Sequence, residues 1–137
     1  MAEKIQFELV SPAKLLVSSP VDMVVVPGSE GDFGALVLHS PMITTVRPGV
    51  IVVHDGGKIS SSTFVAGGFA EVNEERITVL AEEAIPVGDL TQEMAAVRKK
   101  LAKEARDDAK TDREKSNAER LTLIAEAMAE AISGAKH

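Results

Sequence analysis

Several residue types are missing or scarce in this chain of 137 residues, and each absence excludes a class of function. There is no cysteine, which removes disulfides, thiolate nucleophiles and thiolate metal sites together. There is no tryptophan or tyrosine and there are only four phenylalanines, so the aromatic platforms on which nucleic-acid bases and many small ligands stack are largely absent. The net charge of −6 also argues against a nucleic-acid partner, because phosphate binding needs a cationic face.

Long apolar runs are absent as well. The longest are valine-rich stretches such as 23–26 and 50–53, far shorter than the roughly 20 residues of a membrane helix. Residues 1–4 open into a strand-like pattern without the basic and apolar regions of a signal peptide, so we expect no leader. The hydrophobic fraction of 45% is that of an ordinary folded, soluble protein.

Composition changes abruptly near Gly88. All six prolines, all four phenylalanines and nine of the ten glycines lie at or before this residue. Residues 1–88 hold 11 acidic and five basic side chains, whereas the remainder holds ten of each and is rich in alanine. The acidic balance therefore belongs to the first part alone, and we expect two domains, 1–88 and 89–137.

Alternating apolar residues predict β-strands in the first part. The residues that alternate are Ile5, Phe7 and Leu9, then Val21, Met23 and Val25, then Ile77, Val79 and Ala81. Turn sequences separate such runs at 27–31, 55–58 and 73–75, and the middle one is a strong hairpin signal. Gly67-Gly68 indicates a bulge or a close approach of two backbones. Many short strands without an intervening helix predict an antiparallel β-sandwich or flattened barrel.

Helical spacing replaces alternation after Gly88. The predicted first helix runs from Leu90 to Arg106, with Asp89 and Gln92 as its capping box, and the second from Ser116 to Gly134. Their apolar faces are Leu90, Met94, Val97, Leu101 and Ala105, and Leu121, Ile124, Met128 and Ile132. With the charged link 107–115, these helices predict an antiparallel hairpin, marginally stable alone, and hence an α+β fold.

Residues that could carry chemistry are not arranged to do so. His39, His54 and His137 share no metal-ligand spacing with an acidic cluster, and Ser60–Ser62 lie in a strand-like stretch that we expect to be a solvated face. Glu82 and Glu83 are neighbours in a predicted strand, where adjacent side chains point to opposite faces. The sequence therefore predicts an interaction protein with no catalytic residue, no metal and no cofactor.

Three ordered blocks of sequence carry a family resemblance. They are VVVPGSEGDFGALVLHSPMITTVRPG at 24–49, GGFAEV at 67–72 and ITVLAEEA at 77–84. These blocks resemble the epsilon subunit of the F-type ATP synthase, bacterial type. One difference is visible within the first block, because Val37 and Leu38 stand where that family usually has Pro-Gly before the histidine.

The resemblance implies a non-catalytic rotor subunit of the central stalk, which couples rotation of the c-subunit ring to the catalytic head through gamma. It assigns the ring contact to Glu30, Asp32 and His39, with the acidic pair facing arginines of the ring. It assigns the gamma contact to Ser11, Ile43 and Thr44. The implied location is peripheral, on the cytoplasmic face of the bacterial inner membrane.

The resemblance also gives the helical part a regulatory role, with contacts to the alpha and beta subunits. Arg120 is the only basic residue between Ala118 and Ile132, so we expect at most weak inhibition of ATP hydrolysis. Some relatives bind ATP through a motif that corresponds to 90–95 here, but Thr91 and Met94 replace its aspartate and arginine. We therefore expect no nucleotide ligand.

Two alternatives stay open at this point. One is an adaptor sandwich unrelated to rotation, and the other is a sandwich that binds a carbohydrate or another small ligand. The lack of tryptophan and tyrosine weighs against the second alternative.

Overall fold

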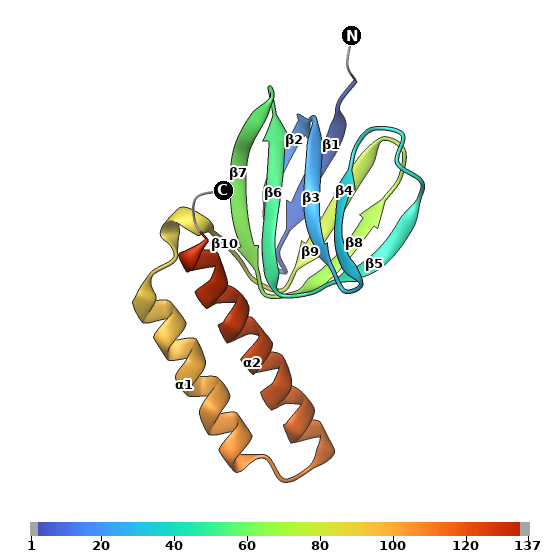
Figure 1. The fold of residues 1–137 in the computed structure, drawn as a ribbon. Helices are drawn as coiled ribbons and strands as arrows, with labels where there is room; N and C mark the ends of the chain where they lie inside the picture. Colours follow the sequence, from blue (N-terminus) through green and yellow to red (C-terminus); the bar gives the residue numbers. More distant parts are fainter. Residues whose placement is uncertain (1–2, 135–137) are drawn as a thin grey trace.

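A computed structural model of the chain describes residues 3–134. Its strands come first and its helices last, as Figure 1 shows. The elements are β1 (Ile5–Val10), β2 (Leu15–Val21), β3 (Met23–Gly28), β4 (Gly31–Ala35), β5 (Met42–Val46), β6 (Gly49–Asp55), β7 (Lys58–Val65), β8 (Gly68–Val72), β9 (Arg76–Ala81), β10 (Ala84–Pro86), a 3-10 turn (Val87–Asp89), α1 (Gln92–Asp108) and α2 (Asp112–Ser133).

The strands form one curled sheet in the order β10-β7-β6-β3-β5-β8-β9-β1-β2, with β4 paired to β3. The sheet folds over so that its two halves enclose a common core, which confirms the predicted β-sandwich followed by helices (Figure 1). All strand pairs within the described residues are antiparallel except one, because β1 lies parallel to β9. Alternation of side chains does not reveal strand direction, so this parallel pair could not be predicted from the residues.

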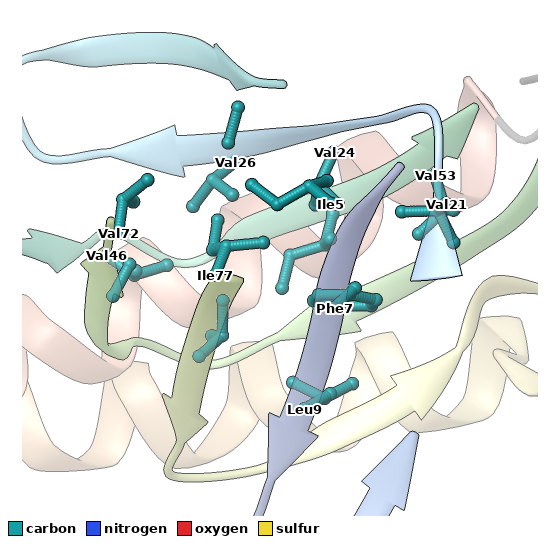
Figure 2. Packing of buried hydrophobic residues seen from close by; sticks show 14 of the residues in the cluster. Ile5, Phe7, Leu9, Val21, Val24, Val26, Val46, Val53, Val72 and Ile77 are labelled. Atoms are coloured by element: carbon teal, nitrogen blue, oxygen red, sulfur yellow. The ribbon is translucent and has the colours of Figure 1, made fainter. Parts of the chain in front are cut away.

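The sandwich core consists of the inward side chains of these strands (Figure 2). The predicted inner faces of β1 and β9 are confirmed, since Ile5, Phe7 and Leu9, and Ile77, Val79 and Ala81, are all buried. The prediction for the stretch Val21, Met23 and Val25 was wrong in its phase after Val21. Asp22 separates β2 from β3, and in β3 the fully buried residues are Val24 and Val26, while Met23 and Val25 are half-buried. Each strand has its own alternation of inward and outward side chains. An alternation counted through Asp22, from β2 into β3, therefore selects the outward residues of β3.

Glycine residues allow one tight turn and one close contact between backbones, both of which were predicted. Gly56 and Gly57 have φ values of 65° and 77°, the pair of left-handed residues that a tight hairpin between β6 and β7 requires. Gly68 confirms the expected close approach of two backbones. A Cβ atom at this residue would lie 1.9 Å from the carbonyl oxygen of Leu80, so no other residue type fits without displacement of β9.

Both helices begin elsewhere than the sequence predicted. The N-cap of α1 is Thr91, whose hydroxyl accepts a hydrogen bond from the Met94 amide, whereas Asp89 lies in the preceding 3-10 turn. The helix α2 begins at Asp112 instead of Ser116, because Thr111 and Glu114 form a complete capping box five residues before the predicted one. The charged link is thus reduced to residues 109–111. The predicted end of α2 at Gly134 is confirmed.

Alanines make up most of the buried residues of the two helices. Ala95 and Ala102 are the buried residues of α1, whereas Val97 and Leu101 of its predicted apolar stripe are 57% and 49% exposed. On α2 the buried residues are Ala118, Ile124, Ala125, Met128 and Ala131. Small side chains let helix backbones approach closely, so burial in the hairpin follows the alanines more than the larger residues of the predicted stripes.

Candidate functional site

The turn between β3 and β4 carries one free carboxylate and one that is already paired. Glu30 is exposed at the tip, and among residues 3–134 no cation forms an ion pair with it. Asp32 accepts a hydrogen bond from Arg47, with an Nη2–Oδ1 distance of 2.5 Å. Arg47 also donates to the carbonyl oxygen of Gly28, which fixes the shape of the turn. Of the two acidic residues predicted to contact the ring, only Glu30 therefore offers an unpaired charge.

His39, the third residue predicted at this surface, lies in the loop after β4 and not in the turn before it. Its Nδ1–H donates to the carbonyl oxygen of Ser40, 2.7 Å away, and its ring centroid lies 6.3 Å from that of Phe33. Within the described residues, no hydrogen bond or ion pair joins His39 to the two acidic residues of the turn. The same loop contains Leu38, which has a φ of 70°.

A row of mainly apolar side chains crosses the outer face of four adjacent strands. The register places Thr45 of β5 opposite Phe69 of β8, Phe69 opposite Leu80 of β9, and Leu80 beside Val10 of β1. We call these four residues the outer row. Phe69 and Leu80 are 56% and 53% exposed, although large apolar side chains within a strand are more often buried. Together with Ser11, three members of the row line a shallow hollow of about 220 Å³.

The structure brings two of the three predicted gamma contacts next to the outer row. Ser11 directly follows Val10, and Ile43, which is 73% exposed, stands two residues before Thr45 on the same face of β5. Thr44 points to the other face. It pairs with the fully buried Ala70 and is itself half-buried, so its neighbour Thr45 occupies the outer position that the sequence reasoning gave to Thr44.

Sequence reasoning missed Phe69 and Leu80, although the signal was present. Each is an apolar residue on the outward-facing side of its strand. In β9, for example, Leu80 lies between the buried residues Val79 and Ala81. An apolar residue on the solvent-facing side of a strand indicates a surface that binds another molecule. The prediction considered only the inward-facing residues of each strand and so overlooked the outer row.

The helices contact the sandwich through a second apolar cluster, which we call the junction cluster. Its buried members are Phe64 and Ala66 of the β7 region, Ala95 of α1, and Ile124, Met128 and Ala131 of α2. Two ion pairs border it: Arg98 of α1 binds Glu83, and Arg120 Nη1 of α2 lies 3.5 Å from Glu82 Oε2. Figure 1 shows the rest of the hairpin projecting away from the strands.

Glu82 and Glu83 correct a detail of the sequence interpretation. They lie in the turn between β9 and β10 and not within a strand, so the rule of opposite faces does not apply to them. Both carboxylates reach arginines of the helices. Their role in this structure is thus to join the helices to the sandwich.

The remaining candidates for chemistry are the other two histidines and the three consecutive serines. His54 is in β6, and His137 lies outside the described residues. Ser60 and Ser61 are exposed as expected, but the hydroxyl of Ser62 is buried and has no hydrogen-bond partner, so the solvated-face prediction was wrong for this residue. Within residues 3–134, no group of three histidine, aspartate or glutamate side chains is placed to hold a metal ion. No helix among these residues is long and apolar enough to cross a membrane.

Comparison with known proteins decides the family. Residues 4–87 match the family model described as the beta-sandwich domain of the ATP synthase delta/epsilon chain. The chain belongs to this family. It is 82% identical over 133 residues to the ATP synthase epsilon chain of Paramagnetospirillum magneticum, which covers 97% of this chain and 100% of the relative. It is 51% identical over 134 residues to that of Rhodospirillum rubrum, with 98% and 100% covered.

Solved structures resemble the fold over nearly its whole length. A chain in the structure of the Euglena gracilis mitochondrial ATP synthase, OSCP/F1/c-ring, matches with a TM-score of 0.78 and 24% identity, covering 96% of this chain and 83% of the other. A chain in the central stalk and c-ring of the Tetrahymena thermophila mitochondrial ATP synthase matches with a TM-score of 0.74 and 11% identity, with 96% and 98% covered. At these identities the likeness concerns the fold.

Proposed function

We propose that this chain is the epsilon subunit of a bacterial F-type ATP synthase. In this role it is a non-catalytic part of the central stalk and couples rotation of the c-subunit ring to the catalytic head through gamma. The family, the epsilon-chain relatives and the central-stalk neighbour support this function. The single observation that carries it is the outer row, an exposed apolar strip on an acidic sandwich. The proposed location is peripheral, on the cytoplasmic face of the bacterial inner membrane.

The gamma subunit is the proposed partner of the outer row. Phe69 and Leu80 are large, exposed and neighbours across two strands, and contiguous exposed apolar side chains of this kind mark protein–protein interaction sites. Ser11 and Ile43 extend the contact at its two ends. Thr44 takes part only through its backbone in this proposal, because its side chain faces inward and Thr45 stands outside.

A binding measurement with purified gamma tests this proposal. Replacement of Phe69 and Leu80 by serine in the full chain should weaken binding by at least about tenfold, or roughly 1.4 kcal/mol, because two apolar contacts are removed. Ile59→Ser is the matched control, since Ile59 is 41% exposed on β7, away from the outer row. Unchanged affinity in the double variant, with the sandwich still folded, would exclude the outer row as the gamma interface.

The c-subunit ring is the proposed partner of the turn between β3 and β4. Glu30 is the main charged contact with arginines of the ring, because Asp32 is already bound to Arg47 and acts by holding the turn in shape. His39 contributes from the neighbouring loop. Glu30→Lys should therefore reduce coupling of proton flow to ATP synthesis more than Asp32→Asn does, and equal coupling in wild type and Glu30→Lys would exclude this contact.

The helical hairpin is proposed as a separate regulatory domain, 89–137, beside the sandwich domain, 1–88. It joins the sandwich through the junction cluster and two ion pairs, and its tip projects away. That arrangement allows the hairpin to reach the alpha and beta subunits. Between Ala118 and Ile132, its terminal helix carries Glu119, Glu126 and Glu130 against Arg120 alone, so only weak inhibition of hydrolysis is proposed.

No nucleotide or other cofactor is part of the proposal. Thr91 uses its hydroxyl to cap α1, and Met94 carries no charge to meet a phosphate. The two alternatives, an adaptor unrelated to rotation and a small-ligand module, are not favoured, because the family and the relatives point to the ATP synthase stalk.

A further inference from the structure

Leu38 combines two features that rarely occur at one residue. Its φ of 70° lies in the left-handed region, and it is the only non-glycine residue among 3–134 with a positive φ. A branched, bulky side chain is strained in that conformation. The side chain is also 69% exposed, so burial within the chain does not offset the strain.

The backbone around Leu38 needs the conformation but not the side chain. The His39 amide donates to the carbonyl oxygen of Leu36 over 3.1 Å, which closes a four-residue turn with Leu38 as its third residue. A positive φ at that position is the requirement of a type II turn, and glycine meets it without strain. The Leu38 amide donates to the carbonyl oxygen of Glu74 over 2.7 Å and ties the turn to the end of β8. Glycine would keep both bonds, so the leucine side chain points to a role outside the fold.

The loop adjoins the surface that carries the outer row. Glu74, its hydrogen-bond partner, follows the last residue of β8 by two positions, and β8 contributes Phe69 to the outer row. Ile43 comes five residues after Leu38 and stands on the outer face of β5. Exposed apolar residues therefore run from Leu80 and Phe69 through Ile43 toward the loop of Leu38, which lies at the ends of β5 and β8.

Acidic residues border this end of the surface. Glu71 is exposed and is the cross-strand partner of Ile43, and Glu74 and Glu75 follow in the turn after β8. None of the three forms an ion pair among the described residues. A complementary partner must offer an apolar pocket bordered by basic side chains.

We propose that Leu38 is an anchor residue that inserts into such a pocket on the gamma subunit and determines the fit of this end of the interface. The inference rests on the proposed function, since it takes gamma as the partner of the outer row. The strain at Leu38 is then a feature of the free chain that places the side chain where gamma receives it. If Leu38 is a strained anchor, a substitution that relieves the strain should raise the stability of the free chain and weaken its binding to gamma.

Three variants of the full chain separate strain from contact. Leu38→Gly relieves the strain and removes the side chain, so its melting temperature should rise by about 2–4 °C while its affinity for purified gamma falls about tenfold or more. Leu38→Ala keeps the positive φ at a residue with a Cβ, so it should lose affinity without the rise in melting temperature. Leu38→Met keeps an apolar side chain of similar volume and should bind gamma within about threefold of wild type.

The results also separate this inference from the proposed function. If Leu38→Gly binds gamma as tightly as wild type while the Phe69→Ser, Leu80→Ser variant does not, the anchor is wrong and the gamma interface stands. If neither variant loses affinity, both proposals fail. A lower melting temperature in Leu38→Gly would show that the residue stabilises the fold and would overturn the argument from strain.

Discussion

At the scale of single residues, Gly68 shows how much of a constraint a sequence can reveal. Two adjacent glycines in a strand-like stretch predicted a close approach of backbones, and the structure confirms it. The approaching partner, the carbonyl oxygen of Leu80, could not be predicted, because pairing between β8 and β9 depends on the whole sheet. Local residue type thus indicates that space is limited, whereas only the fold shows what occupies it.

Gly68→Ala should be among the most damaging substitutions in the sandwich. The new Cβ would lie 1.9 Å from the Leu80 oxygen, and φ is +144°, so β8 and β9 would have to separate. We expect a loss of about 3 kcal/mol or more in the free energy of unfolding, measured by urea denaturation. Gly56→Ala is the matched control: its φ is also positive, at +65°, but nothing lies within 4 Å, so about 1 kcal/mol should be lost. Equal losses would contradict the steric argument.

Thr44 and Thr45 show why the candidate site was only partly predictable. Adjacent residues of a strand face opposite sides, so a shift of one position moves a predicted contact from the surface to the interior. The resemblance pointed to this segment of β5 as a gamma contact, and the register of β5 against β8 shows that Thr45, and not Thr44, is outside. Phe69 and Leu80 were overlooked for a related reason, since their exposure depends on which phase of each strand is buried.

At the scale of elements, the start of α2 was decided by competition between two capping boxes. Ser116 with Glu119 fits the same pattern as Thr111 with Glu114, and the sequence alone did not rank them. The earlier box adds a turn of helix, and its Glu114 side chain accepts hydrogen bonds from the amides of Lys110 and Thr111, each at 3.0 Å. These bonds close the short connection to α1.

Removal of this cap should loosen the hairpin at its tip. Thr111→Ala should cost about 1 kcal/mol of helix stability, because the Glu114 amide loses its partner. Amide hydrogen exchange of residues 112–116 measures the effect. Ser116→Ala is the matched control, since Ser116 lies inside the helix and should leave exchange unchanged or slower. Faster exchange in the control alone would mean that α2 begins where the sequence first indicated.

The same cap gives the hairpin a pH dependence. Hydrogen bonds from the Lys110 and Thr111 amides lower the pKa of Glu114 below its ordinary value of 4.5. A lowered pKa in the folded state means that the stabilisation is present above pH 4.5 and is lost as the pH falls through the lower, folded-state pKa. Exchange at residues 112–116 should therefore accelerate, relative to the intrinsic rate, when the pH is lowered below 4.5. Glu114→Gln should remove this pH dependence, and its persistence in that variant would assign it to another group.

Docking of the hairpin should depend on salt. Arg98 and Glu83 are 26% and 37% exposed, so solvent screens their attraction only in part. Arg98→Gln should weaken docking of the hairpin on the sandwich by about 1 kcal/mol and should make docking less sensitive to NaCl. The distance between fluorophores on β7 and on the hairpin tip measures both effects. Lys103→Gln is the control, because Lys103 pairs with Asp107 within α1 and does not reach the sandwich. A larger effect in the control would exclude the junction pair as the cause.

At the scale of the whole molecule, composition predicted the division into strands and helices, since proline and glycine end near Gly88 and alanine follows. The sequence did not predict where the helices would dock. Phe64 reads as an ordinary strand residue, yet it is fully buried on the helix side and belongs to the junction cluster. A strand residue that is buried under the helices has the same neighbouring sequence pattern as one that is buried in the sandwich core. Only the folded molecule distinguishes the two.

Truncation after Gly88 tests how the parts cooperate. The sandwich keeps its own core and the outer row, so binding to gamma and ATP synthesis should be retained. ATP hydrolysis should rise by less than about tenfold, which corresponds to less than about 1.4 kcal/mol of lost inhibition. Exposure of Phe64 should lower the solubility of the fragment, and truncation combined with Phe64→Ser should restore it. A larger rise in hydrolysis would identify the hairpin as a strong inhibitor.

The parallel pairing of β1 with β9 determines when this protein can fold during translation. The strand β1 leaves the ribosome first, but its place in the sheet is between β2 and β9, and β9 ends only at Ala81. Until then β1 keeps an unpaired edge and the β1–β2 hairpin an uncovered apolar face, both of which a growing chain must keep from other nascent chains. The sandwich therefore cannot close before β9 has emerged, and Phe64 stays uncovered until the helices, which come later in the chain, have followed.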